Sequence, residues 1–318
     1  MGKTRILISG ATGFVGSNLA RRLCKTSEVH IISRKGSNHW RLKDIASDLT
    51  IHEASLTDEN ALNEIAKSAK PDIVYHLATT GLYGGKHPDD REVINTSFLG
   101  SVKLINACSK AGFKCFVNTG SSSEYGIKES PMKETDSCSP INTYGVAKLA
   151  STLYASNFVK KNDLPIVNVR LFSPFGPYDH PLRLISYASL NAAKGKDLEL
   201  SDPNSVRDYI HVDDVVDFYT RLARLGEELK GETLNLGSGQ EMKISYVVKK
   251  IIEFSDSKSK VLWQKALKRD FDTEHWQSDM TKSKKLVKGF KITPFDDSLK
   301  KAVEWFKENH GLYDNLNI

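Results

Sequence analysis

The sequence predicts an α/β fold, a doubly wound parallel sheet followed by a smaller C-terminal lobe. At the start of the chain a short apolar run precedes Gly10, Gly13 and Gly16, and an amphipathic segment follows them. This order is typical of a buried strand, a tight turn and a helix. Apolar strands and periodic helical segments then alternate over about 170 residues, which indicates a parallel sheet with helices on both faces. After Phe172, prolines and glycines interrupt the pattern.

The three glycines are a variant of the dinucleotide-binding fingerprint. In this interpretation Gly10 makes the turn, Gly13 lets the backbone approach a pyrophosphate, and Gly16 lets the helix pack on the strand. The N-terminus of the helix would present free N–H groups and a positive dipole end to the phosphates. For these residues taken alone, a structural turn without a cofactor is the alternative.

The remaining elements follow in order. Further strands are expected at 29–33, 49–54, 71–78, 114–119 and 165–172, and further helices at 58–69, 93–111 and 144–160. Gly112 is a natural C-terminal cap for the helix before it, and a glycine-rich loop spans 81–85. We assign residues 1–172 to a dinucleotide-binding domain and residues 173–318 mainly to a substrate-binding lobe. A segment at about 206–238 is expected to return to the first domain.

The end of the second strand indicates which dinucleotide is bound. An acidic residue at this place takes the ribose 2′-hydroxyl of NAD, whereas an arginine favours the 2′-phosphate of NADP. Ser33, Arg34 and Lys35 stand here, so we expect NADP, with NAD as the alternative cofactor. A merely exposed basic turn is the competing interpretation.

Composition excludes several classes of protein. A hydrophobic content of 39% and a charged fraction of 26% are those of an ordinary soluble protein, and no apolar run approaches the roughly 18 residues of a membrane span. The first strand starts at once, which leaves no room for a signal peptide, so we expect a cytoplasmic protein that binds no membrane.

Charge and cysteine usage exclude further partners. The net charge of +6 is spread along the chain, and the densest lysine run, at 282–291, lacks interleaved aromatic residues. This net charge suits an anionic small molecule about as well as nucleic acid. The lysine run is interpreted as a solvated face, and we expect no nucleic acid. The four cysteines lack metal-type spacing, so no metal is expected and they are interpreted as core residues in a reducing compartment. They are Cys24, Cys108, Cys115 and Cys138.

The motif Tyr144-x-x-x-Lys148 carries the candidate chemistry. Positions i and i+4 share one face of a helix, so the phenol and the ammonium project together. At about 4 Å and an effective dielectric near 20, a cation stabilises a phenolate by about 4 kcal/mol. That would lower a tyrosine pKa from about 10 toward neutrality. Ser121, at the end of the preceding strand, would offer a hydroxyl to the reacting oxygen, with a polar turn as the alternative.

Together these motifs resemble the extended short-chain dehydrogenase/reductases that modify nucleotide sugars, the epimerase, dehydratase and ketoreductase group. The similar stretches are Gly10-Ala-Thr-Gly-Phe-Val-Gly16, Tyr75-His-Leu-Ala78, Asn95, residues 121–126, Tyr144-x-x-x-Lys148 and Arg207-Asp-Tyr-Ile-His-Val-Asp213. The resemblance runs from Arg5 to about Trp305. It implies a Rossmann fold in which Tyr144 is the acid/base, Lys148 binds the nicotinamide ribose and lowers the tyrosine pKa, and Ser121 assists. Ser122 is the alternative to Ser121.

The resemblance also implies the ligand contacts. The cofactor is expected to contact Gly10, Thr12, Gly13, Phe14, Val15, Gly16, Ser33, Arg34, Lys35, Leu56, Leu77, Ala78, Asn95, Tyr144 and Lys148. A nucleotide-diphosphate sugar is expected to contact Ser123, Glu124, Ser173, Arg183, Arg207 and Arg269. Arg207 would hold the diphosphate through a bidentate fork, whereas Arg183 and Arg269 have surface ion pairs as their alternative. A homodimer through the helices near 93–111 and 144–160 is also implied.

Two departures from the family pattern bear on the reaction. Ser173 stands where many relatives carry an asparagine that contacts the diphosphate. Nucleotide-sugar 4,6-dehydratases place acidic residues three and two positions before the tyrosine of the strand-five loop, where this chain has Ser122 and Ser123, with Glu124 one place later. Elimination needs a carboxyl within hydrogen-bond reach, so dehydration is disfavoured unless a contraction of the loop gives Glu124 that role.

The sequence therefore predicts an NADP-dependent oxidoreductase acting at C4 of a nucleotide-linked sugar, foremost a 4-ketoreductase making a deoxysugar nucleotide. A 4-epimerase is the main alternative. A 4,6-dehydratase is less favoured. A non-catalytic relative that senses cofactor or binds RNA is also less favoured, because such a module has no use for an acid/base tyrosine.

Overall fold

The computed structural model describes residues 2–80, 89–266, 275–314 and 316. It confirms the predicted α/β fold: a seven-stranded sheet has the order β11-β6-β5-β4-β1-β2-β3, and every neighbouring pair is parallel. The strands are β1 (Arg5–Ser9), β2 (Glu28–Ser33), β3 (Leu49–Glu53), β4 (Ile73–His76), β5 (Cys115–Ser121), β6 (Ile166–Leu171) and β11 (Thr233–Leu236).

Helices cover both faces of the sheet because side chains alternate along each buried strand. On one face, α1 and α7 share an apolar core with Ile6 and Ile8 of β1. On the other, α2, α4 and α5 share a second core with Leu7. The bounds are α1 (Phe14–Leu23), α2 (Glu59–Ala69), α4 (Gly100–Ala111), α5 (Thr143–Asn162) and α7 (Val212–Arg224).

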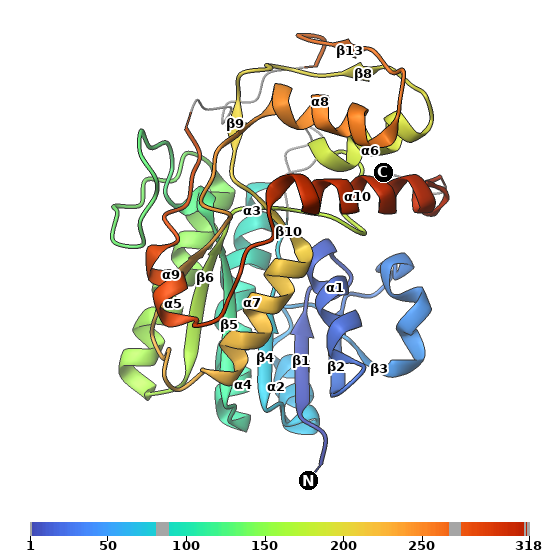
Figure 1. Ribbon diagram of the computed structural model, residues 1–318. Helices are drawn as coiled ribbons and strands as arrows, with labels where there is room; N and C mark the ends of the chain where they lie inside the picture. The colour runs from blue at the N-terminus through green and yellow to red at the C-terminus, as the bar shows by residue number, and fades with distance from the viewer. Residues whose placement is uncertain (1, 81–88, 267–274, 315, 317–318) are drawn as a thin grey trace.

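A second group of helices stands over the carboxyl ends of the strands (Figure 1). These helices, α6 (Leu184–Ala193), α8 (Ile244–Ser255) and α10 (Phe295–Asn309), surround a core of their own. Short strand pairs complete the lobe: β7 (Ser173–Phe175) with β10 (Tyr209–His211), β9 (Val206–Arg207) with β12 (Met242–Lys243), and β8 (Leu198–Glu199) with β13 (Val261–Leu262). After β10 the chain returns through α7 to the sheet, where β11 pairs with β6. No helix among the described residues is both long and apolar enough to span a membrane.

The turn between β1 and α1 is packed backbone against backbone. Gly10 has φ +79°, and a Cβ on it would lie 2.5 Å from the amide nitrogen of Ala78 after β4. A Cβ on Gly16 would lie 2.2 Å from the Gly10 carbonyl oxygen. No larger residue fits at either place without moving the backbone, so these two glycines fix the start of α1 against the ends of β1 and β4.

Two elements differ from the prediction. The helix predicted at 93–111 consists of α3 (Asp90–Ile94), a π-helical turn η2 (Asn95–Leu99) and α4, and it ends at Gly112 with φ +79°. Between β2 and β3 lies a 3-10 helix that the pattern did not indicate, η1 (Trp40–Asp48). The glycine-rich loop predicted at 81–85 lies outside the described residues.

Candidate active site

A pocket of about 490 Å³ lies between the carboxyl ends of the strands and the C-terminal lobe. Ligands bind at this edge in open parallel sheets. Of the predicted cofactor contacts, all but Lys35 and Asn95 line the pocket, and so do the four predicted catalytic residues. Of the predicted substrate contacts, Ser123, Ser173, Arg183 and Arg207 line it, Glu124 does not, and Arg269 lies outside the described residues.

The glycine turn forms one end of this pocket. Gly13 is the N-cap residue of α1 and supplies no side-chain cap, so N–H groups of the first helical turn need an outside partner. Phosphate groups satisfy such a helix end. The missing cap and the close glycine packing therefore fit the pyrophosphate of a dinucleotide.

At the end of β2, the pocket wall contains Ser33 and Arg34. The Ser33 hydroxyl shares a hydrogen bond of 2.7 Å with the His39 ring. The Arg34 side chain is 68% exposed, and its guanidinium forms a loose ion pair, 3.7 Å long, with Glu92 of α3. An exposed pair of this length is worth little, so a more highly charged group could replace Glu92 as the partner of Arg34.

The π-helical turn moves the predicted contact at Asn95. Asn95 is exposed, Thr96 lines the pocket in its place, and Ser97 is buried with its Oγ 2.9 Å from the Thr79 hydroxyl. A π turn inserts an extra residue, which rotates the side chains around the helix axis relative to a regular helix. Lys35 is also exposed and lies outside the lining, beyond the end of β2.

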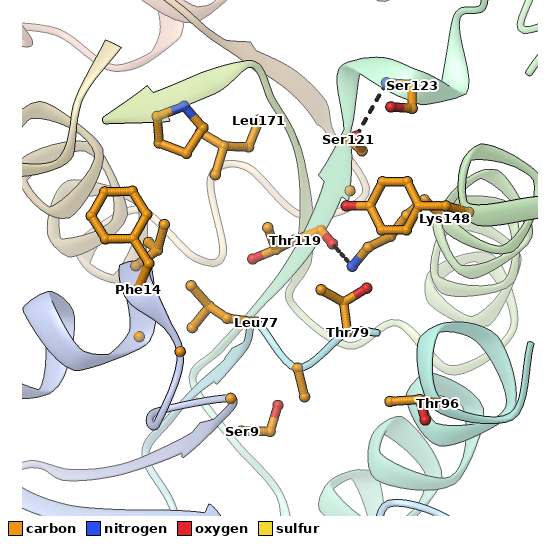
Figure 2. A pocket seen from close by; sticks show the side chains of 18 of the residues that line it. Ser9, Phe14, Leu77, Thr79, Thr96, Thr119, Ser121, Ser123, Lys148 and Leu171 are labelled. Atoms are coloured by element: carbon orange, nitrogen blue, oxygen red, sulfur yellow. Dashed lines mark hydrogen bonds between the residues drawn. The ribbon is translucent and has the colours of Figure 1, made fainter. Parts of the chain in front are cut away.

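The tyrosine–lysine pair is fixed at the start of α5. The helix is capped by Asn142, whose side-chain oxygen accepts the Gly145 N–H at 2.9 Å. Lys148 is buried, its Nζ donates to the Thr119 carbonyl at 2.9 Å (Figure 2), and this Nζ lies 6.0 Å from the centre of the Tyr144 ring. Burial lowers the pKa of Lys148 to about 8, so the ammonium form still predominates at pH 7.

Ser121 is the last residue of β5, and its Oγ accepts the Ser123 N–H at 3.1 Å (Figure 2). Its own O–H can still donate to a ligand. Gly145 brings the tyrosine helix against this serine turn, because a Cβ there would lie 2.5 Å from the Ser123 carbonyl oxygen. The only signal of this contact in the sequence is a glycine within a predicted helix, which often marks such a close approach.

Glu124 was expected to contact the substrate, but it lies outside the lining of the pocket. Its side chain is fully buried: one carboxylate oxygen accepts the Arg170 Nε–H at 2.8 Å, and the other accepts the Ser121 N–H at 2.8 Å and the Thr152 hydroxyl at 3.1 Å. A buried carboxylate needs such partners to offset its desolvation. The carboxylate therefore holds β5, β6 and α5 together and does not reach a ligand in the pocket.

The opposite end of the pocket is formed by the C-terminal lobe. Arg183 is paired with Asp179 at 3.2 Å, and the Arg207 guanidinium lies 5.9 Å from the ring centre of Trp276, which also lines the pocket. Nothing near Trp276 in the sequence indicates a site. The charged side chains among the described lining residues are all cations, namely these two arginines, Arg34 and Lys148. The pocket is therefore suited to a ligand with anionic groups at both ends.

Asp208 fixes the strand that carries Arg207. It is fully buried, and its carboxylate accepts the backbone N–H groups of Ser238 at 2.6 Å, Gly239 at 3.1 Å and Ser278 at 2.9 Å. Burial raises the pKa of Asp208 despite these hydrogen bonds. The carboxylate thus ties the loop that follows β11 and the segment after Trp276 to the substrate end of the pocket.

The fold and the pocket define a Rossmann-fold enzyme that works with a dinucleotide. The family model described as the NAD dependent epimerase/dehydratase family matches residues 6–237. The chain belongs to this family.

Its relatives include several sugar-nucleotide enzymes. A UDP-N-acetyl-alpha-D-glucosaminuronate decarboxylase from Bacillus cytotoxicus is 28% identical over 325 residues, covering 96% of this chain and 98% of the relative. A protein described as an uncharacterized UDP-glucose epimerase, YtcB, from Bacillus subtilis is 28% identical, covering 95% and 97%. A solved epimerase structure from Methanothermobacter thermautotrophicus has a TM-score of 0.88 at 28% identity, covering 98% and 94%.

Replacing Glu124 by glutamine tests its structural role. Glu124→Gln leaves the Arg170 guanidinium buried without a counter-charge, so we expect the free energy of unfolding to fall by about 3–5 kcal/mol. Urea denaturation measures this loss. The exposed Glu129→Gln should stay within about 0.5 kcal/mol of the wild type. A fully stable Glu124→Gln protein that had lost all turnover would instead make Glu124 a catalytic acid and restore the dehydratase interpretation.

Replacing Lys148 by methionine removes the buried ammonium. This change should raise the free energy of unfolding and abolish turnover. In the folded protein the pKa of Lys148 is about 8, whereas in the unfolded chain it is about 10.4. Between these values the unfolded chain binds more protons, so the free energy of unfolding of the wild type should increase as the pH rises from about 8 to 10. Lys148→Met should lack this rise and be more stable at pH 7, on the order of 2 kcal/mol.

Urea denaturation at pH 7 and pH 9.5 checks this prediction, with the exposed Lys67→Met as the matched control. A Lys148→Met protein that is less stable than the wild type at pH 7 would contradict it. The expected loss of turnover is measured on the same preparation.

Proposed function

We propose that this protein is an NADPH-dependent oxidoreductase acting at C4 of a nucleotide-linked sugar, and that it reduces the 4-keto group of a 4-keto deoxysugar nucleotide to a hydroxyl group, which gives a deoxysugar nucleotide. The observation that carries the proposal is Arg34 in the pocket wall at the end of β2, next to the glycine turn. In dinucleotide-binding folds this position faces the adenosine ribose.

A 2′-phosphate would displace Glu92 from the loose pair with Arg34 and gain charge-assisted hydrogen bonds. The residue directly at the end of β2 is Ser33, whose neutral hydroxyl does not repel that phosphate. Cells keep the NADP pool reduced, so a preference for it suits an enzyme that delivers reducing equivalents. The four free cysteines are consistent with a reducing, cytoplasmic location, which we include in the proposal.

Tyr144 is proposed to give a proton to the sugar oxygen as the carbonyl at C4 becomes an alcohol. The bound nicotinamide would supply the hydride to the same carbon. The Lys148 ammonium stabilises the phenolate that remains, and solvent restores its proton. The Ser121 hydroxyl would donate a hydrogen bond to the reacting oxygen and orient it, with Ser122, which also lines the pocket, as the alternative donor.

A diphosphate-linked sugar suits the other end of the pocket. Arg183 and Arg207 offer guanidinium groups, which match phosphate geometry, and Trp276 offers an aromatic surface. The names of the Bacillus relatives refer to UDP sugars, which supports this class of substrate. The buried position of Glu124 disfavours dehydration, because elimination needs a carboxyl within reach of the sugar.

A 4-epimerase is the second candidate, favoured by the similarity to a Bacillus protein described as an epimerase. It would use the same Tyr144 and Lys148 but would oxidise and reduce one carbon in turn. Such an enzyme regenerates its cofactor in every cycle, whereas a reductase consumes it.

We also propose a homodimer. Val146 is 51% exposed and Leu153 is 60% exposed. Seven residues apart on α5, they lie on one face of the helix. Leu153→Glu should convert the dimer to a monomer in size-exclusion chromatography with light scattering, because a charge would be buried in the interface. The exposed Leu312→Glu, on the C-terminal segment, is the control. An unchanged mass for Leu153→Glu, or a monomeric wild type, would refute this interface.

Cofactor consumption separates the reductase from the epimerase. We expect NADPH to be consumed one for one with a 4-keto sugar nucleotide, followed at 340 nm, and NADP to bind at least about tenfold more tightly than NAD, as one charge-assisted hydrogen bond would give. Arg34→Asp should shift this preference toward NAD. Lys35→Asp, next to it but outside the pocket lining, should leave the preference nearly unchanged.

Tyr144→Phe is the catalytic control for the same assay. It should keep cofactor binding and lose turnover by orders of magnitude, because the proton donor alone is removed. Interconversion of two sugar nucleotides without net NADPH consumption would refute the reductase in favour of the epimerase.

A further inference from the structure

Arg41 connects the two halves of the pocket from outside it. Its Nε donates to the carbonyl of Tyr178 at 2.7 Å, and its Nη1 donates to the carbonyl of Thr12 at 3.4 Å. Thr12 belongs to the glycine turn and lines the cofactor end of the pocket. Tyr178 belongs to the loop between β7 and α6. One guanidinium thus bridges two main-chain segments that lie far apart in the sequence.

The Tyr178 side of this bridge leads to a predicted substrate contact. The loop continues through Asp179, a buried carboxylate that pairs with Arg183 at 3.2 Å, and Arg183 lines the pocket at the residue that precedes α6. Tyr313, near the end of the chain, donates its hydroxyl to the Asp179 carbonyl at 3.1 Å. A shift of the loop at Tyr178 would therefore change the position of Arg183.

The side chains around Tyr178 stabilise one backbone conformation of this residue. Tyr178 has φ +67°, in the left-handed region that is unfavourable for a large side chain. The Arg21 guanidinium stacks on its ring at 4.1 Å and donates to the Arg41 carbonyl at 2.7 Å. The Trp305 ring packs on Tyr178 from the lobe, with ring centres 4.8 Å apart. A strained conformation persists only when its surroundings fix it in this way.

The helix α1 adds a second connection. Asn18 donates its side-chain amide to the Pro177 carbonyl at 2.9 Å, one residue before Tyr178. The loop is thus tied both to the turn that precedes α1, through Arg41, and to the helix itself. Both connections run from the cofactor side of the pocket to the lobe.

We propose that Arg41 is a positioning residue that couples the two binding steps: a cofactor bound at the glycine turn strengthens the hold on the sugar nucleotide through Arg41 and the 178–183 loop. The coupling rests on the proposed function. It is reciprocal, since two ligands must change each other's affinity by the same factor.

Arginine suits this role for a geometric reason. Its planar guanidinium presents several donors in fixed directions, so it can bind two carbonyls at once and transmit a shift from one to the other. A lysine at this position has three donors on one ammonium but lacks the rigid planar fork. Its flexible ammonium would transmit little of the movement.

Calorimetry measures the coupling directly. The tightest-binding of UDP, dTDP, CDP and GDP is titrated into the wild type with and without saturating NADP, and NADP is titrated with and without that nucleotide. We expect each ligand to tighten the other by at least about fivefold, the lower end of typical couplings. Arg41→Met should bring this factor to within about twofold of unity, and Arg41→Lys should give an intermediate factor. Lys43→Met, exposed on the same 3-10 helix, should keep the wild-type factor.

The outcomes separate this proposal from the proposed function. Binding of both ligands to the wild type without coupling, or full coupling in Arg41→Met, overturns the role of Arg41 and leaves the proposed function standing. Failure of the wild type to bind NADP and NAD overturns both. Where Arg41→Met does not fold, Arg41→Lys decides: a reduced factor supports the role, and a wild-type factor overturns it.

Discussion

The arrangement of the site depends on one buried ion pair, between Glu124 and Arg170. The same carboxylate accepts hydrogen bonds from the end of β5, at Ser121, and from α5, at Thr152, while Arg170 belongs to β6. Three elements thus converge on one charge, and two of them, β5 and α5, carry the proposed reactive groups. Because a buried charge without its partner is costly, the three cannot separate, and the serine turn keeps a constant position relative to the tyrosine helix.

Close contacts between main-chain segments also fix the elements of the site relative to one another. Gly145 lets the first turn of α5 touch the serine turn, and Gly10 lets the cofactor turn touch the end of β4. Contacts between main chains leave little freedom for adjustment, unlike contacts through long side chains. The reacting groups are thereby held in place before any ligand binds, which is the main way in which an enzyme can use geometry to lower a barrier. Arg41 is a different kind of contact, because it links the cofactor turn to the lobe through a side chain.

The fold could be predicted from local pattern, and much of the site could not. The strands that carry the pocket are continuous apolar runs, and glycine spacing marks the first turn. By contrast, the inward orientation of Glu124 depends on Arg170, which is 46 residues away in the sequence. Asn95 is displaced by a π turn that hydrophobic periodicity does not reveal. Arg41 and Trp276 lie near the site because of tertiary packing alone. No neighbouring residue in the sequence indicates that they belong to it.

The return of the chain to the sheet has a consequence for engineering. β11 pairs with β6 at the edge of the sheet, yet it lies after part of the lobe in the sequence. A fragment that stopped at residue 172 would expose β6 as a bare edge strand, and such edges pair with other chains and aggregate. Grafting a lobe from a relative to change which sugar is accepted therefore requires three splice sites, one after β6 and one on each side of the segment that contains α7 and β11.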